Sequence, residues 1–194
     1  DSAVLGGLRS VHLLLAKGPG SQKITKAFTK HGATRHPGVK VTAKMSNGSY
    51  ITFDDAWQHG LELGQNRPPQ LIIAGVDDIP PLVGALRSCG WDCPRDFQIL
   101  AFSSEGYQEL RFVDTSIPLS QIVVPLVEIG SQAARYLIQK TNDVEQATFE
   151  RSVRCRFLPG GTAPALQQGP LLSRVASQFH NTDSQKTIDC KTST

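Results

Sequence analysis

The stretch "LIIAGVDDIPPLVGALRSCGWDCPRDFQILAFSS", residues 71–104, carries the clearest folding signal in the sequence. A short apolar run ends in two aspartates, and a second apolar run, further along, ends in two serines. Between them lies an apolar-rich segment that starts with two prolines and stops at Gly90, as expected of a helix that begins at Pro80 or Pro81. The order of strand, acidic loop, helix, turn and strand predicts a βαβ unit.

The same alternation continues on both sides of this unit. Short apolar or alternating runs predict strands at residues 10–16, 39–45, 70–76, 97–102, 116–124 and 148–158. Helical spacing of apolar residues predicts helices at residues 21–32, 52–66, 79–90 and 125–140. Ser21 and Gly32 are the expected caps of the first helix, and Thr52 or Asp54 is the expected N-cap of the second. This pattern predicts an α/β fold with a doubly wound parallel sheet in a Rossmann-like three-layer arrangement.

Length and composition fit a packed lobe followed by a polar tail. The chain has 194 residues, of which 39% are hydrophobic and 19% are charged. No run of about 18 apolar residues exists, so no membrane span is expected, and the N-terminus lacks the features of a signal peptide. From Gly160 onward, Gly, Pro, Ser, Thr and Gln dominate. We therefore expect one domain at residues 1–158 and a C-terminal tail at residues 159–194.

The charges and the cysteines restrict the possible partners. Eight Lys and Arg residues and no acidic residue lie between Ser2 and Phe53. This block is either an ordinary solvated face or a region that attracts anionic ligands or nucleic acid. The four cysteines lack the paired spacing of a metal site, so reduced, packed thiols are expected, which suits a cytoplasmic protein.

Polar residues at the strand ends predict a ligand site. Parallel α/β sheets bind ligands beyond the carboxyl ends of their strands, where Asp77, Asp78, Ser103 and Ser104 fall, together with the loop after the first strand. The aspartates could accept hydrogen bonds from sugar hydroxyls, cap the next helix, or form part of an acidic metal pocket. The serines could contact a ligand or make a turn.

No arrangement of residues typical of catalysis appears, so an enzyme is not expected. The sequence has no serine nucleophile elbow, no phosphate-binding glycine motif and no shared spacing among its histidines. No cofactor, metal ligand or catalytic residue is predicted. His12 is expected to be a satisfied core residue, and Trp57 is expected to pack on a helix face.

Several motifs in register resemble the LacI/GalR family of bacterial transcription regulators over about residues 9–164. The acidic loop is Asp77-Asp78, and the "GALR" helix, residues 84–87, is followed by Gly90. The Pro-x-Asp turn is residues 94–96, and the strand end with an aromatic residue is residues 102–104. The segment "IPLSQIVVPLVEIGSQAARYL", residues 117–137, and "LPGGTAP", residues 158–164, are similar to later motifs of the family.

The resemblance implies the effector-binding and dimerisation region of such a regulator, built as a periplasmic-binding-protein-like lobe. It implies a cytoplasmic protein with a small-molecule effector, a homodimer, no membrane contact, and DNA binding only through a headpiece. We expect the chain to start at the second lobe, with the headpiece and most or all of the first lobe absent from this sequence. A periplasmic sugar-binding protein that serves transport is the alternative.

Three family contacts for neutral sugars are replaced here. Phe28 aligns with an arginine that grips effector hydroxyls, Ser103 with an aspartate, and Val124 with a polar glutamine. A glycine loop flanked by Lys17 and Lys23 lies at the start of a predicted helix, where backbone N–H groups favour anions. An anionic effector is therefore predicted, with a solvated lysine face as the alternative. The predicted effector-binding residues are Lys17, Ser21, Lys23, Asp77, Asp78, Ser103 and Ser104.

Overall fold

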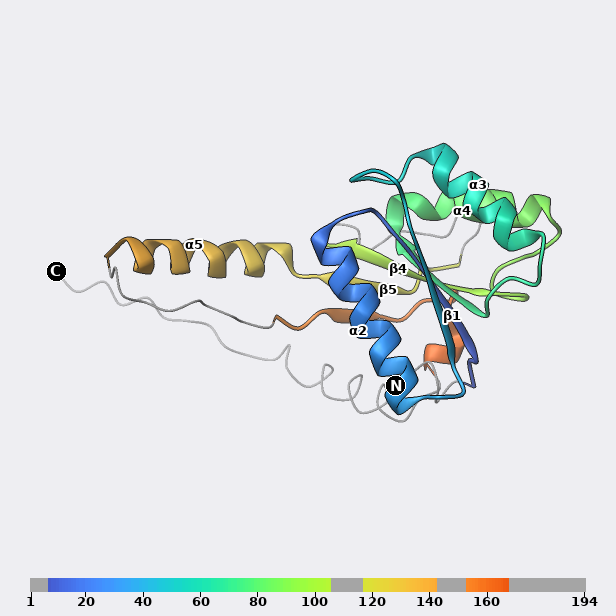
Figure 1. The fold of residues 1–194 in the computed structure, drawn as a ribbon, viewed down its shortest axis with the longest axis horizontal. Coiled ribbons are helices and arrows are strands. Elements are labelled where there is room, and N and C mark those ends of the chain that lie inside the picture. The colour runs from blue at the N-terminus through green and yellow to red at the C-terminus, as the bar shows by residue number, and fades with distance from the viewer. Residues whose placement is uncertain (1–6, 106–116, 143–152, 168–194) are drawn as a thin grey trace.

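A computed structural model of the chain describes residues 7–105, 117–142 and 153–167 and shows one six-stranded sheet in the order β2-β1-β3-β4-β5-β6 (Figure 1). The first five strands are parallel, and β6 pairs with β5 in the antiparallel direction. The strands are β1 (Ser10–Leu15), β2 (Lys40–Met45), β3 (Leu71–Gly75), β4 (Gln98–Ser104), β5 (Gln121–Val124) and β6 (Arg156–Leu158). The predicted α/β class with a largely parallel sheet is confirmed.

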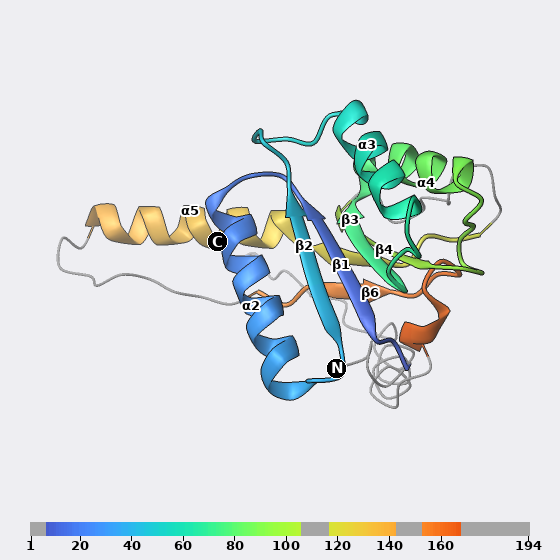
Figure 2. The same cartoon turned by 45° about the vertical axis from the view of Figure 1, so that its right-hand side comes forward.

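Helices connect β1 to β2, β2 to β3 and β3 to β4, and they lie against the sheet (Figure 2). The α-helices are α2 (Pro19–Arg35), α3 (Phe53–Gly64), α4 (Ile79–Ser88) and α5 (Leu126–Asn142). Two short 3-10 helices complete the structure: η1 (Val76–Asp78) and η2 (Pro164–Gln167). Helices α3 and α4 pack against each other. Helix α2 packs against β2, the strand at one edge of the sheet. Within the described ranges, no helix combines the length and apolar character needed to cross a membrane.

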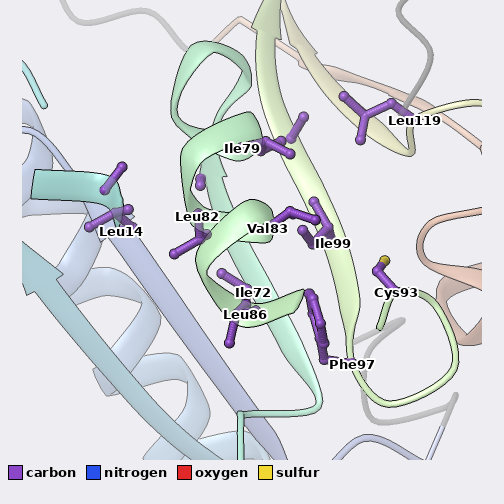
Figure 3. Packing of buried hydrophobic residues seen from close by; sticks show 13 residues of the cluster. Leu14, Ile72, Ile79, Leu82, Val83, Leu86, Cys93, Phe97, Ile99 and Leu119 are labelled. Carbon is purple, nitrogen blue, oxygen red and sulfur yellow. The ribbon is translucent and has the colours of Figure 1, made fainter. Parts of the chain in front are cut away.

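Alternation along the strands divides the core into two apolar clusters. On β3, Ile72 and Ala74 face the side covered by α3 and α4, whereas Leu71 and Ile73 belong to the cluster on the other face. Side chains of α4, including Leu82 and Leu86, pack over Ile72 on the first side (Figure 3). The period of two in an extended chain explains how one strand supplies both layers.

Two predicted caps of the first helix are wrong, the first because of a proline and the second because of packing. The helix α2 begins at Pro19 with Gly18 as N-cap residue, so Ser21 lies inside the first turn. Proline sets the backbone angle of a first helical turn, which moves the start of the helix upstream. At the other end, α2 continues past Gly32 to Arg35. A Cβ on Gly32 would lie 2.8 Å from Cγ2 of Val41, so this glycine permits close packing on β2.

The N-cap prediction for the second helix is correct. The Thr52 side chain accepts a hydrogen bond from the backbone of Asp55 at 3.0 Å, and the Asp55 carboxylate accepts one from the Thr52 backbone at 3.2 Å. This reciprocal capping box leaves α3 with a defined start directly after the loop that follows β2.

Buried hydroxyl groups join the end of the described chain to the sheet. Thr162 Oγ1 accepts a hydrogen bond from the backbone of Ser120 and donates one to the carbonyl of Ile99, both at 2.9 Å. The Ser120 hydroxyl donates to the Gly160 carbonyl at 2.7 Å. Residues 160–166 therefore pack into the lobe predicted for residues 1–158. Residues 168–194, with most of the predicted tail, lie outside the described part of the chain.

Replacing Thr162 with valine is expected to lower the free energy of unfolding by about 2 kcal/mol, because it leaves a buried backbone donor and a buried carbonyl without partners. A urea titration followed by circular dichroism measures the change. The matched control is Thr29→Val, which removes an exposed hydroxyl on α2 and should shift the midpoint little. Equal midpoints for the two variants would contradict the role of the Thr162 hydroxyl.

Candidate functional site

The carboxyl ends of β1, β3 and β4 meet at one edge of the sheet, because these strands are parallel neighbours. Lys17 follows β1, the two aspartates follow β3 within η1, and Ser103 and Ser104 are the last residues of β4. The topology therefore brings together the strand-end residues that the sequence predicted. The binding role of these residues is not tested by their position and stays a prediction.

Asp78 combines partial burial with a perturbed carboxylate. Burial first, and the charge of Asp77 second, raise its pKa to about 6, whereas a hydrogen bond from the Gly75 backbone opposes the rise. Asp78 is the N-cap residue of α4, but its side chain makes no capping hydrogen bond. The interpretation of Asp78 as a helix cap alone is therefore not supported for its side chain. Asp77 is exposed beside it.

Ser103 offers a buried hydroxyl at the same edge. Its residue is 6% exposed, and its Oγ has no hydrogen-bond partner among the described residues. Alternation along β4 places Ser103 on the face of Ile99 and Ala101, toward α4. A buried hydroxyl without a partner costs free energy, so a ligand that reaches it can gain a hydrogen bond. Ser104 is half-buried on the opposite face of the strand.

The predicted basic side of the site, at the loop after β1 and the start of α2, is more exposed to solvent than Asp78 and Ser103. The backbone N–H of Lys17 donates to the carbonyl of Gly48 at 2.9 Å, which ties the loop after β1 to the loop after β2. The Lys17 and Lys23 side chains are exposed, and Ser21 is half-buried in the first turn of α2. That turn has no acidic residue and no side-chain cap. Its backbone N–H groups and positive dipole end suit an anion.

Sequence reasoning missed two exposed aromatic residues at this edge. Tyr50 is 69% exposed in the loop after β2, and Phe53 is 64% exposed at the first residue of α3. Phe53 stacks on Trp57 with a centroid distance of 6.1 Å. The segment "SYITF", residues 49–53, was the available signal, since it places two aromatic residues in and directly after a predicted loop. Trp57 packs against Gly84 of α4, as predicted for a helix-face residue.

Two of the replaced family positions have structural roles here. Phe28 is half-buried on α2 and packs against the apolar cluster that includes Leu13 and Ile73. Val124 is the last residue of β5 and is paired with Ser104 in the sheet. A further residue escaped prediction: the Glu105 carboxylate accepts a hydrogen bond from the Val127 backbone at 3.0 Å, in the first turn of α5.

Metal and thiol chemistry find little support in the described ranges. There, no group of three or more His, Cys, Asp or Glu side chains is arranged to hold a metal ion. Cys89, Cys93 and Cys155 are free thiols, and burial, as the largest cause, raises the pKa of Cys93 to about 12. A thiol with such a pKa is not a nucleophile at neutral pH. His12 is a satisfied core residue, as predicted, with both ring nitrogens hydrogen-bonded.

The strand order defines a single α/β lobe with polar residues at the carboxyl ends of its strands. A family model for periplasmic binding protein-like domains matches residues 5–163, and the chain belongs to this family. No curated protein matches the sequence.

Solved structures of LacI-family regulators share the fold. A LacI family regulator from Enterococcus faecium with bound ribose has 17% sequence identity and a TM-score of 0.59, covering 82% of this chain and 58% of that one. One from Arthrobacter sp. FB24 in complex with lactose has 15% identity and a TM-score of 0.59, covering 83% and 60%. A putative LacI regulator from Bacillus cereus subsp. cytotoxis has 18% identity and a TM-score of 0.63, covering 82% and 56%. The chain therefore spans less than two thirds of the length of each.

Proposed function

We propose that this chain is the effector-binding and dimerisation region of a LacI-type transcription regulator. The observation that carries the proposal is the polar edge, where the buried Ser103 hydroxyl has no partner among the described residues and Asp78 is held partly desolvated. The family match and the regulators that bind ribose or lactose support it. A ligand bound at this edge would favour one arrangement of two lobes and thereby change the affinity for DNA.

A sugar-binding protein that serves transport is the second candidate, because the matched family description names periplasmic binding proteins. The structural neighbours favour the regulator, which would act in the cytoplasm. Under the regulator proposal, DNA is contacted through a headpiece outside this chain. The discriminating observation is the coding sequence upstream of residue 1, which would encode either a helix-turn-helix headpiece or a secretory signal.

The effector is proposed to be a small sugar-like or anionic metabolite. The Asp78 carboxylate, the Ser103 hydroxyl and the exposed Tyr50 suit a hydroxylated ring, since carboxylates accept hydrogen bonds from sugar hydroxyls and aromatic faces cover apolar ring surface. The uncapped start of α2, near Lys17 and Lys23, suits a phosphate or carboxylate group. A phosphorylated sugar would place its ring against Asp78 and Ser103 and its phosphate at the start of α2.

Calorimetry with ribose, lactose and a sugar phosphate tests the proposed effector class. The regulator proposal expects at least one sugar to bind, with a preference for the phosphorylated form that Lys23→Ala removes. Equal affinity for neutral and phosphorylated sugars, or no effect of Lys23→Ala, would contradict the anion site alone. Absence of binding by every sugar, measured with the full-length protein, would contradict the effector proposal itself.

Replacing Asp78 with asparagine is expected to weaken sugar binding about 10- to 100-fold, because a charge-assisted hydrogen bond becomes a neutral one. The same change should stabilise the fold at pH 7.5. A carboxyl with a raised pKa contributes its full stability below the unfolded value of 3.8 and loses it as the pH rises through about 6. Removing the charge should therefore raise the free energy of unfolding by about 1 kcal/mol after allowance for solvent screening.

Calorimetry and urea titration at pH 7.5 measure the two effects of Asp78→Asn. Asp54→Asn is the matched control, since it neutralises an exposed carboxylate on α3 that has no role in the proposed site. It should leave sugar affinity unchanged. If Asp78→Asn binds sugar with the affinity of the wild type, Asp78 does not contact the sugar.

A further inference from the structure

Two buried histidines meet between α3 and the sheet. His12 comes from the middle of β1 and His59 from α3, and they are 5% and 4% exposed. Their Nε2 atoms lie 2.7 Å apart, and the ring centroids are separated by 4.8 Å. Neither residue belongs to the polar edge at the carboxyl ends of the strands, so the pair has a role separate from the effector site.

The outer ring nitrogens fix the proton positions of the pair. His59 Nδ1 lies 3.1 Å from Glu62 Oε2, a distance at which the N–H donates to the carboxylate. His59 Nε2 is then unprotonated and accepts a hydrogen bond from His12 Nε2–H. His12 Nδ1 in turn accepts from the hydroxyl of Thr42 on β2, at 2.7 Å. Every group has a partner when both rings are neutral, with one proton between the two rings.

The charged groups that face the pair come from β2 and α3. Lys44 lies two residues after Thr42 on β2, forms an ion pair with Glu62, and interacts with both histidines. Asp55 on α3 interacts with Lys44, and Lys40 lies on the same face of β2 by alternation. The Lys44–Glu62 pair is exposed, so it contributes little to holding α3 in place.

We propose that His12 and His59 form a proton-operated latch that holds α3 against β1 and β2 at neutral pH and releases it in acid. The space between the two Nε2 atoms accommodates one proton. A first added proton can reside on His12 Nδ1, where Thr42 turns from donor to acceptor. A second added proton puts N–H groups on both Nε2 atoms, and these two donors cannot remain 2.7 Å apart.

The other contacts of α3 determine what moves when the latch opens. Gly60 of α3 packs closely on Leu82 of α4, and Gly64 packs on Cys89 directly after α4, so α3 has close contacts with α4 that do not involve the histidines. Hydrogen bonds from Lys44 and from His59 lower the pKa of Glu62, and the one from His59 lies within α3 itself, so it survives the separation of α3 from β2. Release therefore separates α3 from β1 and β2. The loop Ser46–Thr52, which joins β2 to α3 at the polar edge, follows this movement.

The direction of the pH effect follows from the folded-state pKa values. Burial first, then the charges of His59 and Lys44, lower the pKa of His12 to about 4. Burial also lowers the pKa of His59, although Glu62 opposes it. A histidine with a depressed pKa contributes its full stability above the unfolded value of 6.5 and loses that contribution as the pH falls toward about 4. The latch should therefore open between these two pH values.

Nuclear magnetic resonance and hydrogen exchange of the full chain test the latch. At pH 7.5, His12 should be the Nε2–H tautomer and His59 the Nδ1–H tautomer. As the pH falls below 6.5, exchange of the α3 and β2 amides, corrected for its intrinsic pH dependence, should rise. Because opening takes up two protons, the exchange rate of these amides should rise on the order of 100-fold for each pH unit of acidification. The amides of β3 and β4 should stay protected.

The double variant His12→Leu/His59→Leu replaces the pair with apolar side chains that do not titrate. It should abolish the acid-dependent rise in α3 exchange, whereas His36→Gln, a histidine change at the carboxyl end of α2, should preserve it. An unchanged acid transition in the double variant overturns the latch. If that variant does not fold, the wild type still decides: histidine titration below pH 6 together with loss of α3 protection supports the latch, and titration without that loss refutes it.

Discussion

Replacing Gly60 with valine should lower the free energy of unfolding by about 3 kcal/mol, because no space exists for a side chain between α3 and α4. A Cβ at this position would lie 2.7 Å from the carbonyl oxygen of Leu82 and 2.6 Å from Cβ of Ala85. Both neighbours belong to the rigid part of a buried helix, so neither can rotate away. One turn later, a Cβ on Gly64 would lie 2.6 Å from Sγ of Cys89. The two glycines together let α3 approach α4 closely.

Gly130 on α5 provides a matched control for this prediction. It is a helical glycine, and a Cβ added to it would meet no heavy atom of a neighbouring element within 4 Å. Replacing it with alanine should stabilise the helix slightly, by up to about 1 kcal/mol, because glycine has a low helix propensity. Gly60→Ala should lose stability despite the same gain in propensity. Urea midpoints that move in the same direction for Gly60→Ala and Gly130→Ala would contradict the close-packing argument.

The sheet was predictable because its signals are local. In β3, alternate residues face opposite apolar clusters, and the same apolar run is visible in the sequence as residues 71–74. The caps of α2 were less predictable. Gly32 looked like a helix stop, but its lack of a Cβ serves contact with Val41, which is nine residues away in sequence and on another element. The meaning of a glycine depends on what packs against it.

The candidate site was predictable only where it followed the strand ends. The position of Asp78 and Ser103 at one edge of the sheet was predictable because parallel strands place their carboxyl ends together. The contact between His12 and His59 was not predicted, since the two residues lie 47 positions apart in the sequence. The spacing of His59 and Glu62, three residues apart on a predicted helix, was the available hint. A partner on β1 could be identified only from the tertiary arrangement.

The helix α5 is the other feature whose meaning depends on tertiary context. It starts beside the carboxyl end of β5 and projects away from the sheet in both views (Figures 1 and 2). Its large apolar side chains are exposed, with exposed fractions of 54% for Leu126, 70% for Val127, 40% for Ile129, 61% for Leu137 and 63% for Ile138. Exposed apolar residues gathered along one helix mark an interaction surface.

Self-association of the isolated chain through α5 is therefore expected, and the double variant Leu137→Glu/Ile138→Glu should weaken it at least about 100-fold. Each buried Leu or Ile side chain contributes at least about 1.5 kcal/mol, and a carboxylate in its place adds a desolvation cost. Sedimentation equilibrium at high micromolar concentration measures the change. Gln139→Glu adds a charge at an exposed polar position of the same helix and should leave association intact. A wild-type chain that stays monomeric at that concentration, or variants that associate equally, would show that the apolar side of α5 does not mediate contact between copies.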